Sequence, residues 1–573
     1  MVKPGIEAGA GAVEAAVQLP SGDGWLLVGW TPRRWAALEP AERVYAQHSF
    51  GMVTGEAHSV FHERADRLGF CTVLLGPTHQ AAKLMGVEVA GLRLAVAPEG
   101  VAQEFQAVAT LARRLAHAAG AGSRGFLDVL PRPDFDGVES VSRLWPPVHF
   151  GLDQAVRVGE DGLALAGSLI DTGQSVAQIA VHGGGHRVVL DPARWVTVRR
   201  PELLKDVAGP YGIEDDRVGF VAYAAGAGGA GTQPVIEIET TSGEFGFKPF
   251  RVFDSPALGV IKQFLSVPAP TSGRLQARFD DVLGPTVAGL IAARRPSGPG
   301  RDLAFGMPVD RAAVSVIIPL YGRIDFMELQ LALFSERPGR ASEIIYVLDD
   351  PSLEEAAERL AFACWSRFKL PFRLLILPEN RGYAGANNAG LQAASGNHVC
   401  LLNSDVFPMA GEGLGWVERL SAHLERDRSL GAVGPRLLFG DGTVQHQGMH
   451  YERVPEFADW WFPIHTEKGA IPREAASLLR PRAITGACMV VRRAEVAGYG
   501  GLDEGYVIGD FEDADLCERL AEDGRGCAVD ASVTLHHLER QSQGAGQVWR
   551  SNATLYNAWR FNRRWGEGIG DGS

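Results

Sequence analysis

The sequence has little of what marks a secreted or membrane-spanning protein. Six cysteines occur in 573 residues, and none of them form a CxxC pair. No apolar stretch reaches the roughly 20 residues that cross a bilayer. The first residues, MVKPGIEAGAGAVEAAVQLPSG, lack the apolar core of a secretion signal. These absences disfavour a disulfide scaffold and predict reduced thiols in a soluble, cytoplasmic protein.

An excess of positive charge is also missing. The formal net charge is −13, which argues against a general nucleic-acid binder or a binder of anionic membranes. Peripheral membrane contact through a local basic patch stays open, and the oligomeric state is undetermined. Hydrophobic residues make up 46% and charged residues 21%, as in folded globular proteins. The length suggests roughly three or four domains.

The first half of the chain reads as β-rich. Short apolar strands alternate with Gly, Pro and Asp, and PVIEIETTSGEFGFKPF (234–250) predicts a hairpin around Ser242 and Gly243. We expect two sandwich-like domains in this half. The predicted organisation is a flexible tail (1–17), β-rich domain 1 (18–145), β-rich domain 2 (146–268) and a partly helical linker (269–312).

The two β-rich domains show a faint internal repeat. DGWLLVG (23–29) resembles DGLALAG (161–167), and RLGF (67–70) resembles RVGF (217–220). The offsets are 138 and 150 residues, so the copies would differ by loop insertions. We interpret domain 2 as a possible repeat of domain 1.

From residue 313 onward, apolar strands alternate with helical segments. The strands are VSVIIPL (314–320), EIIYVLD (343–349), FRLLILP (372–378) and HVCLLNSD (398–405). Near-continuous apolar strands joined by helices predict an α/β domain with a parallel sheet covered on both faces. Ligands bind beyond the carboxyl ends of such strands.

Several of these strands end in polar residues. Asp349 and Asp350 close the second strand, Asn380 follows the third, and Asp405 follows the fourth. A buried unpaired carboxylate is costly, so these acids either cap the strands in water or are held at the rim to meet a ligand. Their convergence on one rim favours a site.

Seven segments in order resemble an inverting family 2 glycosyltransferase with the GT-A fold. The segments are VSVIIPLYG (314–322), EIIYVLDDPS (343–352), ENRGYAGANNAGLQAASG (379–396), LLNSDVFP (401–408), ITGACMVVRR (484–493), GDFEDADLCERLAEDG (509–524) and VTLHHLERQS (533–542). Within this family, the sequences of these segments are most similar to those of rhamnosyl- and related cell-surface-glycan transferases. The resemblance covers roughly the last 250 residues, so we expect a GT-A catalytic domain over 313–573.

The resemblance implies a divalent cation, Mg²⁺ or Mn²⁺, which offsets the charge that builds on a departing diphosphate. Asn403, Ser404 and Asp405 match the family's DxD-like motif, with Asp405 as metal ligand and the other two near the nucleotide sugar. Asn403 replaces the first acid, so a strict metal requirement is undecided. His536 matches a position that reaches the metal or the diphosphate, while we expect His537 to be structural. The alternative for Asp405 is a simple strand cap.

Further residues are expected to bind the nucleotide sugar. By the resemblance, Asp349 accepts from the imide N–H of uracil or thymine, and its alternative role is a helix N-cap. Pro351 stands where the family usually has Gly, so this loop can differ in shape. The other predicted donor-site residues are Pro319, Tyr321, Asp350, Arg381, Asn387 and Gly486. For Arg381 and Asn387, a Gly-rich turn with polar caps is the alternative explanation.

Inversion needs a base opposite the leaving group. The segment GDFEDADLC places four acids within six residues, and their mutual repulsion can raise a carboxylate pKa. By the resemblance Asp513 is the base, with Glu512 beside it. A solvated acidic helix start would look similar.

Trp460 and Trp461 are candidates for the acceptor side, because aromatic faces stack on sugar rings, although a Trp pair can equally belong to the core. The resulting hypothesis is transfer from a UDP- or dTDP-sugar to a hydroxyl of a glycan, glycolipid or glycoprotein, in bacterial surface-glycan synthesis. The alternative is a catalytically idle carbohydrate-binding or scaffold protein that uses the β-rich half. A nucleotidyltransferase would need a Gly-rich, basic loop after the first strand, where only Arg323 stands.

Overall fold

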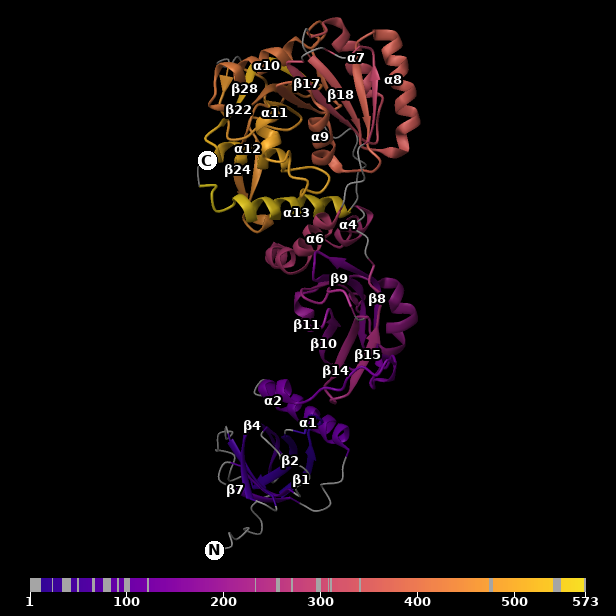
Figure 1. The fold of residues 1–573 in the computed structure, drawn as a ribbon, viewed down its shortest axis with the longest axis vertical. Helices are drawn as coiled ribbons and strands as arrows, with labels where there is room; N and C mark the ends of the chain where they lie inside the picture. Colours follow the sequence, from indigo (N-terminus) through magenta and orange to yellow (C-terminus); the bar gives the residue numbers. More distant parts are fainter. Residues whose placement is uncertain are drawn as a thin grey trace. The chain divides into compact units, whose positions relative to one another are not determined.

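The computed structural model describes residues 12–22, 24–32, 43–48, 51–63, 67–75, 84–89, 92–96, 104–120, 123–231, 233–253, 258–268, 272–294, 300–307, 309, 312–339, 342–473, 478–538 and 548–570. The chain divides into two compact units, one of Met1–Ala193 with Thr197–Phe253 and one of Arg194–Val196 with Asp254–Ser573 (Figure 1). Among the described residues, no helix combines the length and apolarity needed to span a membrane.

The first unit begins with a closed barrel. Its strands are β1 (Ala12–Gln18), β2 (Gly24–Pro32), β3 (Arg43–His48), β4 (Gly51–Glu63), β5 (Arg67–Leu75), β6 (Leu84–Val89) and β7 (Leu92–Val96), in the order β1-β2-β5-β4-β3-β6-β7. The barrel closes because β1 pairs antiparallel with β2 and parallel with β7.

This barrel differs from the expected sandwich, because the alternation of apolar residues is the same in both architectures and strand closure is a long-range property. The expected tail also ends earlier. Residues 12–17 lie in β1, where Val13 and Ala16 are completely buried. Residues 1–11 lie outside the described residues.

Two helices follow the barrel, α1 (Phe105–Ala119) and α2 (Arg124–Val129). Val108 and Ala112 of α1 share an apolar cluster with Leu26 of β2 and Val73 of β5. Helix α1 therefore belongs to the barrel core.

The rest of the first unit holds two four-stranded sheets, as expected for a sandwich-like region. One has the order β12-β13-β9-β8 and the other β11-β10-β14-β15. The strands are β8 (Val148–Val158), β9 (Gly162–Asp171), β10 (Val176–Gly183), β11 (His186–Leu190), β12 (Val196–Val198), β13 (Gly219–Ala224), β14 (Val235–Thr240) and β15 (Phe245–Pro249), and α3 (Pro201–Leu203) is a single turn. The predicted hairpin is β14–β15.

The two β-rich regions share an unusual register. Gly29 pairs with Phe70 across β2 and β5, and Gly167 pairs with Phe220 across β9 and β13. On the other side of each glycine the partner strand is irregular, between Val13 and Ala15 in one region and between Leu152 and Gln154 in the other.

A side chain is excluded at both glycines, because an added Cβ would lie 2.3 Å from the Ala12 carbonyl oxygen or 2.0 Å from that of Gly151. The repeat stays a prediction, and this shared bulge opposite glycine is what a duplicated three-stranded unit would show.

The second unit starts with helices α4 (Leu258–Leu265), α5 (Leu275–Arg278) and α6 (Gly284–Ala293). Helix α13 (Val548–Trp565) lies against α4 and α6 (Figure 1). Strand β16 (Arg301–Phe305) pairs with β19. The described parts of 269–312 are thus ordered helices and an edge strand, in contrast to the expected linker, because their apolar residues are buried against the C-terminal domain.

The main sheet of the second unit has the order β16-β19-β18-β17-β20-β27-β22-β28-β21, with β23 and β26 paired at its side. Its strands are β17 (Val314–Leu320), β18 (Ser342–Leu348), β19 (Phe372–Ile376), β20 (His398–Leu402), β21 (Val406–Pro408), β22 (Leu430–Leu438), β23 (Val444–His446), β26 (Leu478–Leu479), β27 (Cys488–Arg492) and β28 (Gly526–His537). Strands β17 to β20 run parallel, as predicted.

Helices cover both faces of this sheet. Val316 and Ile318 share a core with α7 (Phe326–Glu336), α8 (Glu354–Phe368) and α10 (Gly415–Arg426). Ile317 faces α9 (Gly382–Ala393) on the other side, where a Cβ on Gly390 would lie 2.3 Å from it. The predicted doubly covered α/β sheet is confirmed.

The remaining elements of the second unit are β24 (Met449–Val454), β25 (Trp460–His465), α11 (Arg493–Gly498) and α12 (Glu512–Glu522). All six cysteines are free and buried, as the sequence predicts.

Candidate active site

The polar ends of β17, β18 and β20 meet at one edge of the sheet. The Asp349 N–H donates to the Leu320 carbonyl at 2.9 Å, which joins the ends of β18 and β17. The Asn403 N–H donates to the Ala487 carbonyl at 2.9 Å, which joins the end of β20 to the residues before β27. The edge expected to bind a ligand is therefore built by four backbone segments, the ends of β17, β18 and β20 and the residues before β27.

Asp349 anchors the start of α9. Its two carboxylate oxygens accept the backbone N–H groups of Arg381 at 2.6 Å and Gly382 at 2.9 Å. The residue is only 3% exposed, and burial raises its pKa to about 7 although these hydrogen bonds oppose the shift. The helix cap before α8 is instead Asp350, which accepts from the N–H of Ser352 at 3.2 Å.

Asp350 also joins two loops, because its carboxylate accepts from the N–H of Gly322 at 3.3 Å. Tyr321 lies beside this contact and is 39% exposed, so its ring is available to a ligand. Pro319 is half-buried within β17.

Two other predicted donor-site residues are engaged within the protein. The Arg381 guanidinium donates to Glu504 at 2.9 Å, although its buried Nε has no partner among the described residues. Asn387 is buried where α9 lies close to the sheet, and its amide donates to the Tyr383 carbonyl at 2.9 Å. In this conformation Asn387 offers no surface to a nucleotide, in contrast to the expectation.

A chain of hydrogen bonds connects the donor edge with the acidic helix α12. The Tyr383 hydroxyl, one residue beyond the Asp349 contacts, donates to the Gly486 carbonyl at 2.6 Å. The Gly486 N–H donates to the Asp513 carboxylate at 2.8 Å. The structure therefore brings Asp349, Gly486 and Asp513 into one connected group.

Asp513 and Glu512 differ in their environments. Burial raises the pKa of Asp513, but the N–H groups of Gly486 and Ala514 stabilise its ionised form. Burial also raises the pKa of Glu512, and the charges of Asp513 and Asp510 add to that shift. One Glu512 oxygen has no partner among the described residues. Buried neighbouring carboxyls with raised pKa values are typical of acid–base sites.

The loop before α12 is strained. Ile508, Asp510 and Phe511 have φ of 67°, 77° and 75°, the left-handed region that side chains disfavour. Asn557 of α13 holds this loop from inside the protein. Its Oδ1 accepts the Val507 N–H at 2.8 Å, and its Nδ2 donates to the Gly509 carbonyl at 2.6 Å and to the carbonyls of Val507 and Asp510, each at 3.2 Å.

In the sequence, the aromatic residues of the run Trp549–Trp565 at helical spacing indicate a helix that packs against the domain, and this pattern does not reveal the clamp made by Asn557. A buried asparagine within an apolar helix face is the signal that could have revealed it, since buried polar groups need partners.

At the other end of the edge, the DxD-like segment meets a histidine. The Asp405 Oδ1 lies 3.3 Å from the His537 Nε2, while the His537 Nδ1–H donates to Gln445 at 3.2 Å. Because Nδ1 donates to Gln445, the Nε2 atom that faces Asp405 can either donate to the carboxylate or bind a cation together with it.

The structure thus places His537, and not the expected His536, beside Asp405. The His536 Nδ1–H donates to the Phe439 carbonyl at 3.3 Å, because alternate residues of a strand point to opposite faces. Ser404 and Asn403 are half-buried beside Asp405. Among the described residues, no group of three or more His, Cys, Asp or Glu side chains could hold a metal, so Asp405 and His537 form a pair.

Trp460 and Trp461 do not form an open acceptor platform. Each is 5% exposed. The Trp460 indole donates to Gln276 at 2.5 Å, and the Trp461 indole donates to the Gly566 carbonyl at 3.2 Å. Both rings are core residues against the preceding helices and α13, which corrects the acceptor-side prediction.

Comparison with known families identifies the domain that carries this edge. Residues 315–493 match the model described as Glycosyl transferase family 2. Over these residues the predicted resemblance to a family 2 glycosyltransferase is thus confirmed, and the same residues carry the parallel strands and their polar rim.

Curated relatives match about half of the chain or less. The O-antigen biosynthesis protein RfbC of Myxococcus xanthus is 28% identical over 264 residues, which cover 43% of this chain and 19% of that protein. The pre-mycofactocin glycosyltransferase of Mycobacterium tuberculosis is 30% identical over 279 residues, 47% of this chain and 50% of that protein. The uncharacterized protein y4gI of Sinorhizobium fredii is 26% identical over 243 residues, 40% of this chain and 25% of that protein. The chain thus spans half or less of these relatives.

Solved structures show weaker similarity. GalNAc-T7 with UDP, GalNAc and Mn²⁺ matches with a TM-score of 0.36 and 16% identity, over 45% of this chain and 48% of that one. The mannosyltransferase PcManGT of Pyrobaculum calidifontis, in complex with GDP-Man and Mn²⁺, matches with a TM-score of 0.29 and 19% identity, over 55% of this chain and 77% of that one.

Proposed function

We propose that this chain, whose residues 315–493 form a family 2 glycosyltransferase domain, is an inverting glycosyltransferase. The donor is a UDP- or dTDP-sugar, and the acceptor is a hydroxyl of a glycan, glycolipid or glycoprotein. The relative named for O-antigen biosynthesis supports a setting in bacterial surface-glycan synthesis.

One observation carries the proposal. Asp513 is held by the Gly486 N–H at the same sheet edge where Asp349 and Asn403 end their strands. The N–H donors stabilise the ionised form of its carboxylate, while burial raises its pKa. Such a group suits a general base that takes the proton of the acceptor hydroxyl as its oxygen attacks the anomeric carbon and the bond to the nucleoside diphosphate breaks.

On the donor side, Asp349 and the loop that it anchors form the nucleotide end of the edge. A carboxylate there accepts from the imide N–H of uracil or thymine, the basis for the UDP or dTDP preference. Tyr321 supplies an exposed ring beside it.

The residues at the other end fit a divalent cation. Asp405 offers a carboxylate oxygen and His537 a ring nitrogen, already 3.3 Å apart. Mg²⁺ and Mn²⁺ accept such ligands, with water and donor oxygens completing the shell. When bound, the cation would offset negative charge on the leaving diphosphate. His537 thus replaces His536 as the proposed metal ligand.

The test is release of UDP or dTDP from a panel of nucleotide sugars by the full chain, with and without Mn²⁺. We expect Asp513→Asn to lower the rate at least about a hundredfold, the contribution typical of a general base. Glu522→Gln, an exposed acid on the same helix, is the matched control and should retain wild-type release.

Release unaffected by Asp513→Asn would refute the base assignment. A wild-type chain that binds these nucleotide sugars without releasing nucleotide in the presence of acceptor glycans would favour the idle binding protein instead.

A further inference from the structure

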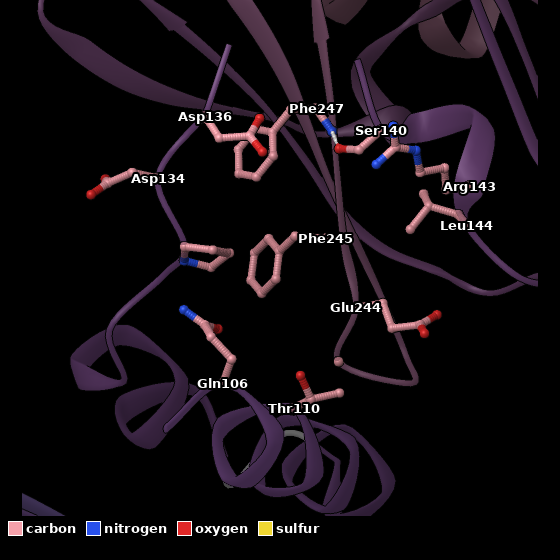
Figure 2. A pocket seen from close by; sticks show the side chains of 12 residues that line it. Gln106, Thr110, Asp134, Asp136, Ser140, Arg143, Leu144, Glu244, Phe245 and Phe247 are labelled. Atoms are coloured by element: carbon pink, nitrogen blue, oxygen red, sulfur yellow. Dashed lines mark hydrogen bonds between the residues drawn. The ribbon is translucent and has the colours of Figure 1, made fainter. Parts of the chain in front are cut away.

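A hollow of about 400 Å³ lies in the first unit, far along the sequence from the glycosyltransferase domain (Figure 2). It is bounded by α1, by the segment 133–144 and by the β14–β15 hairpin. Small-molecule sites commonly occupy about 300–1,000 Å³. The hollow is therefore large enough for one or two sugar rings.

Its floor is aromatic and rigid. The rings of Phe245 and Phe247 stack with centroids 6.4 Å apart and planes 15° apart. The Arg113 guanidinium lies 4.8 Å from the Phe245 centroid and donates to the buried Glu239 carboxylate at 3.0 Å. This buried ion pair packs against one face of the Phe245 ring and fixes its orientation. Figure 2 shows the ring in the middle of the hollow.

The backbone beneath the hollow is equally constrained. Gly243, at the turn of the hairpin, has φ of 84°, and a Cβ there would lie 2.4 Å from the Thr110 carbonyl oxygen of α1. The β14–β15 hairpin therefore packs directly against α1. This contact fixes the distance between these two walls of the hollow.

The rim carries hydrogen-bonding groups that the protein does not use. Figure 2 shows Gln106 of α1 below the Phe245 ring, and Asp134 and Arg143 of the segment 133–144 on opposite sides of it, with the Asp134 carboxylate pointing away from the ring. Within the described part of the chain, the side chains of these three residues make no hydrogen bond or ion pair. Asp136 and Glu244 add two further carboxylates, which also accept from the Val138 N–H at 2.9 Å and from the Ser242 hydroxyl at 3.2 Å. The rim thus offers mostly acceptors.

Other ligand classes fit less well. Strand β15 is a sheet edge, but at Phe247 both backbone groups are occupied, since its N–H donates to the Ser140 hydroxyl at 2.9 Å and its carbonyl accepts the Ser140 N–H at 2.8 Å. A peptide therefore cannot add as a strand there. Three carboxylates against one arginine disfavour a phosphate. The described residues contain no acid cluster arranged to hold a metal.

We propose that this hollow binds a neutral sugar residue of a glycan. The Phe245 ring would pack against the C–H face of a pyranose, while Gln106 contributes both a donor and an acceptor, Asp136 accepts a hydroxyl proton and Arg143 donates to a hydroxyl oxygen. An apolar aromatic floor with a few convergent polar groups is the composition of small-ligand sites. This binding site is independent of the proposed transferase activity.

The test is binding of methyl glycosides of glucose, galactose, mannose, rhamnose and N-acetylglucosamine to the full chain, measured by saturation-transfer NMR titration. We expect at least one of them to bind, and Phe245→Ala to weaken it at least about tenfold. Gln106→Ala and Arg143→Ala should each weaken it several-fold, and these exposed positions keep the test valid if Phe245→Ala fails to fold.

Two controls separate this site from others. Tyr211→Ala removes an exposed aromatic ring of the same unit that does not line the hollow, and Asp405→Asn alters the proposed cation site. Neither should change glycoside binding.

Absence of binding by every glycoside in the set would overturn the proposal, as would binding that survives all three pocket variants or disappears in Asp405→Asn. Competition by inorganic phosphate would show that the hollow selects anions instead. Nucleotide release from the donor panel is measured separately, so failure of either proposal is recognised on its own.

Discussion

Replacement of Asn557 by alanine tests whether the strained loop before α12 must be clamped for turnover. The substitution removes one acceptor and two donors that bind the backbone of residues 507–510. This loop leads directly into Glu512 and Asp513, and the Ile508 carbonyl also accepts the Tyr383 N–H at 2.8 Å. Release of the loop would therefore disturb both the proposed base and the start of α9.

The magnitude follows from the contacts. The two shortest bonds, to the Val507 N–H and the Gly509 carbonyl, would be lost, and each buried group left unpaired costs about 1–3 kcal/mol. The left-handed backbone conformations of Ile508, Asp510 and Phe511 each cost roughly 1–2 kcal/mol of strain, and the hydrogen bonds from Asn557 hold the loop in this strained form. The lower limit for the two lost bonds alone, about 2 kcal/mol against the closed loop, lowers turnover about 30-fold, because each 1.36 kcal/mol is a factor of ten.

The assay compares Asn557→Ala with Asn552→Ala in nucleotide release at a temperature well below the melting transition of both. Asn552 is a matched control, since it is also fully buried on α13 and donates to two carbonyls, those of Leu265 and Val267, each at 2.8 Å. Both variants should lose similar thermal stability, but only Asn557→Ala should lose turnover. Equal turnover losses in the two variants, or a loss within twofold for Asn557→Ala, would refute the reasoning.

Three further predictions follow from the same geometry. His537→Gln should raise the Mn²⁺ concentration needed for half-maximal nucleotide release at least about tenfold, as is typical when a residue that supports a metal site is replaced. His536→Gln, which changes the neighbour on the opposite face of the strand, should change that concentration less than about twofold. The reverse order would restore His536 as the proposed metal ligand. Trp460→Ala should lower the melting temperature and leave the acceptor KM unchanged, and a selective rise in that KM would reinstate an acceptor role. The two units should respond oppositely to pH in calorimetry. Burial raises the folded-state pKa of Asp349 to about 7, so its contribution to the stability of the second unit falls as pH rises from about 4 to about 7. Burial opposes ionisation of Glu237 and Glu239 too, but hydrogen bonds and charges from His182, His117 and three arginines bring their pKa values to about 2, so they stabilise the first unit above about pH 4.5 and lose that effect as pH falls toward about 2. A pH profile that is flat for both units would contradict this assignment of charges.

The sequence was most informative where function depends on order along the chain. Strands at 314–320, 343–349 and 398–405 are continuous in sequence and apolar, and their polar ends must share one edge once the strands are parallel. Asp349 and Asp405 could therefore be placed at a common rim, and Asp513 beside them by resemblance, before any coordinates. The hairpin at 234–250 and the buried cysteines followed from equally local patterns.

Contacts between distant segments were beyond the sequence. Whether His536 or His537 faces Asp405 depends on the pairing of β21 with β28, because a shift of one residue exchanges the two faces of a strand. The burial of Trp460 and Trp461 depends on helices almost 200 residues earlier and on α13. Strand closure likewise turned the expected first sandwich into a barrel.

By itself, the sequence determined the class of chemistry, because acids at strand ends and on a helix start are encoded by local spacing and hydrophobic pattern. Only the tertiary structure decided in which direction the pKa values of these groups shift and which neighbours hold them, because a carboxyl's proton affinity depends on the burial and the hydrogen bonds that folding gives it. The hydrogen bonds to Asp513, the clamp from Asn557 and the glycan-sized hollow floored by Phe245 all belong to that second group.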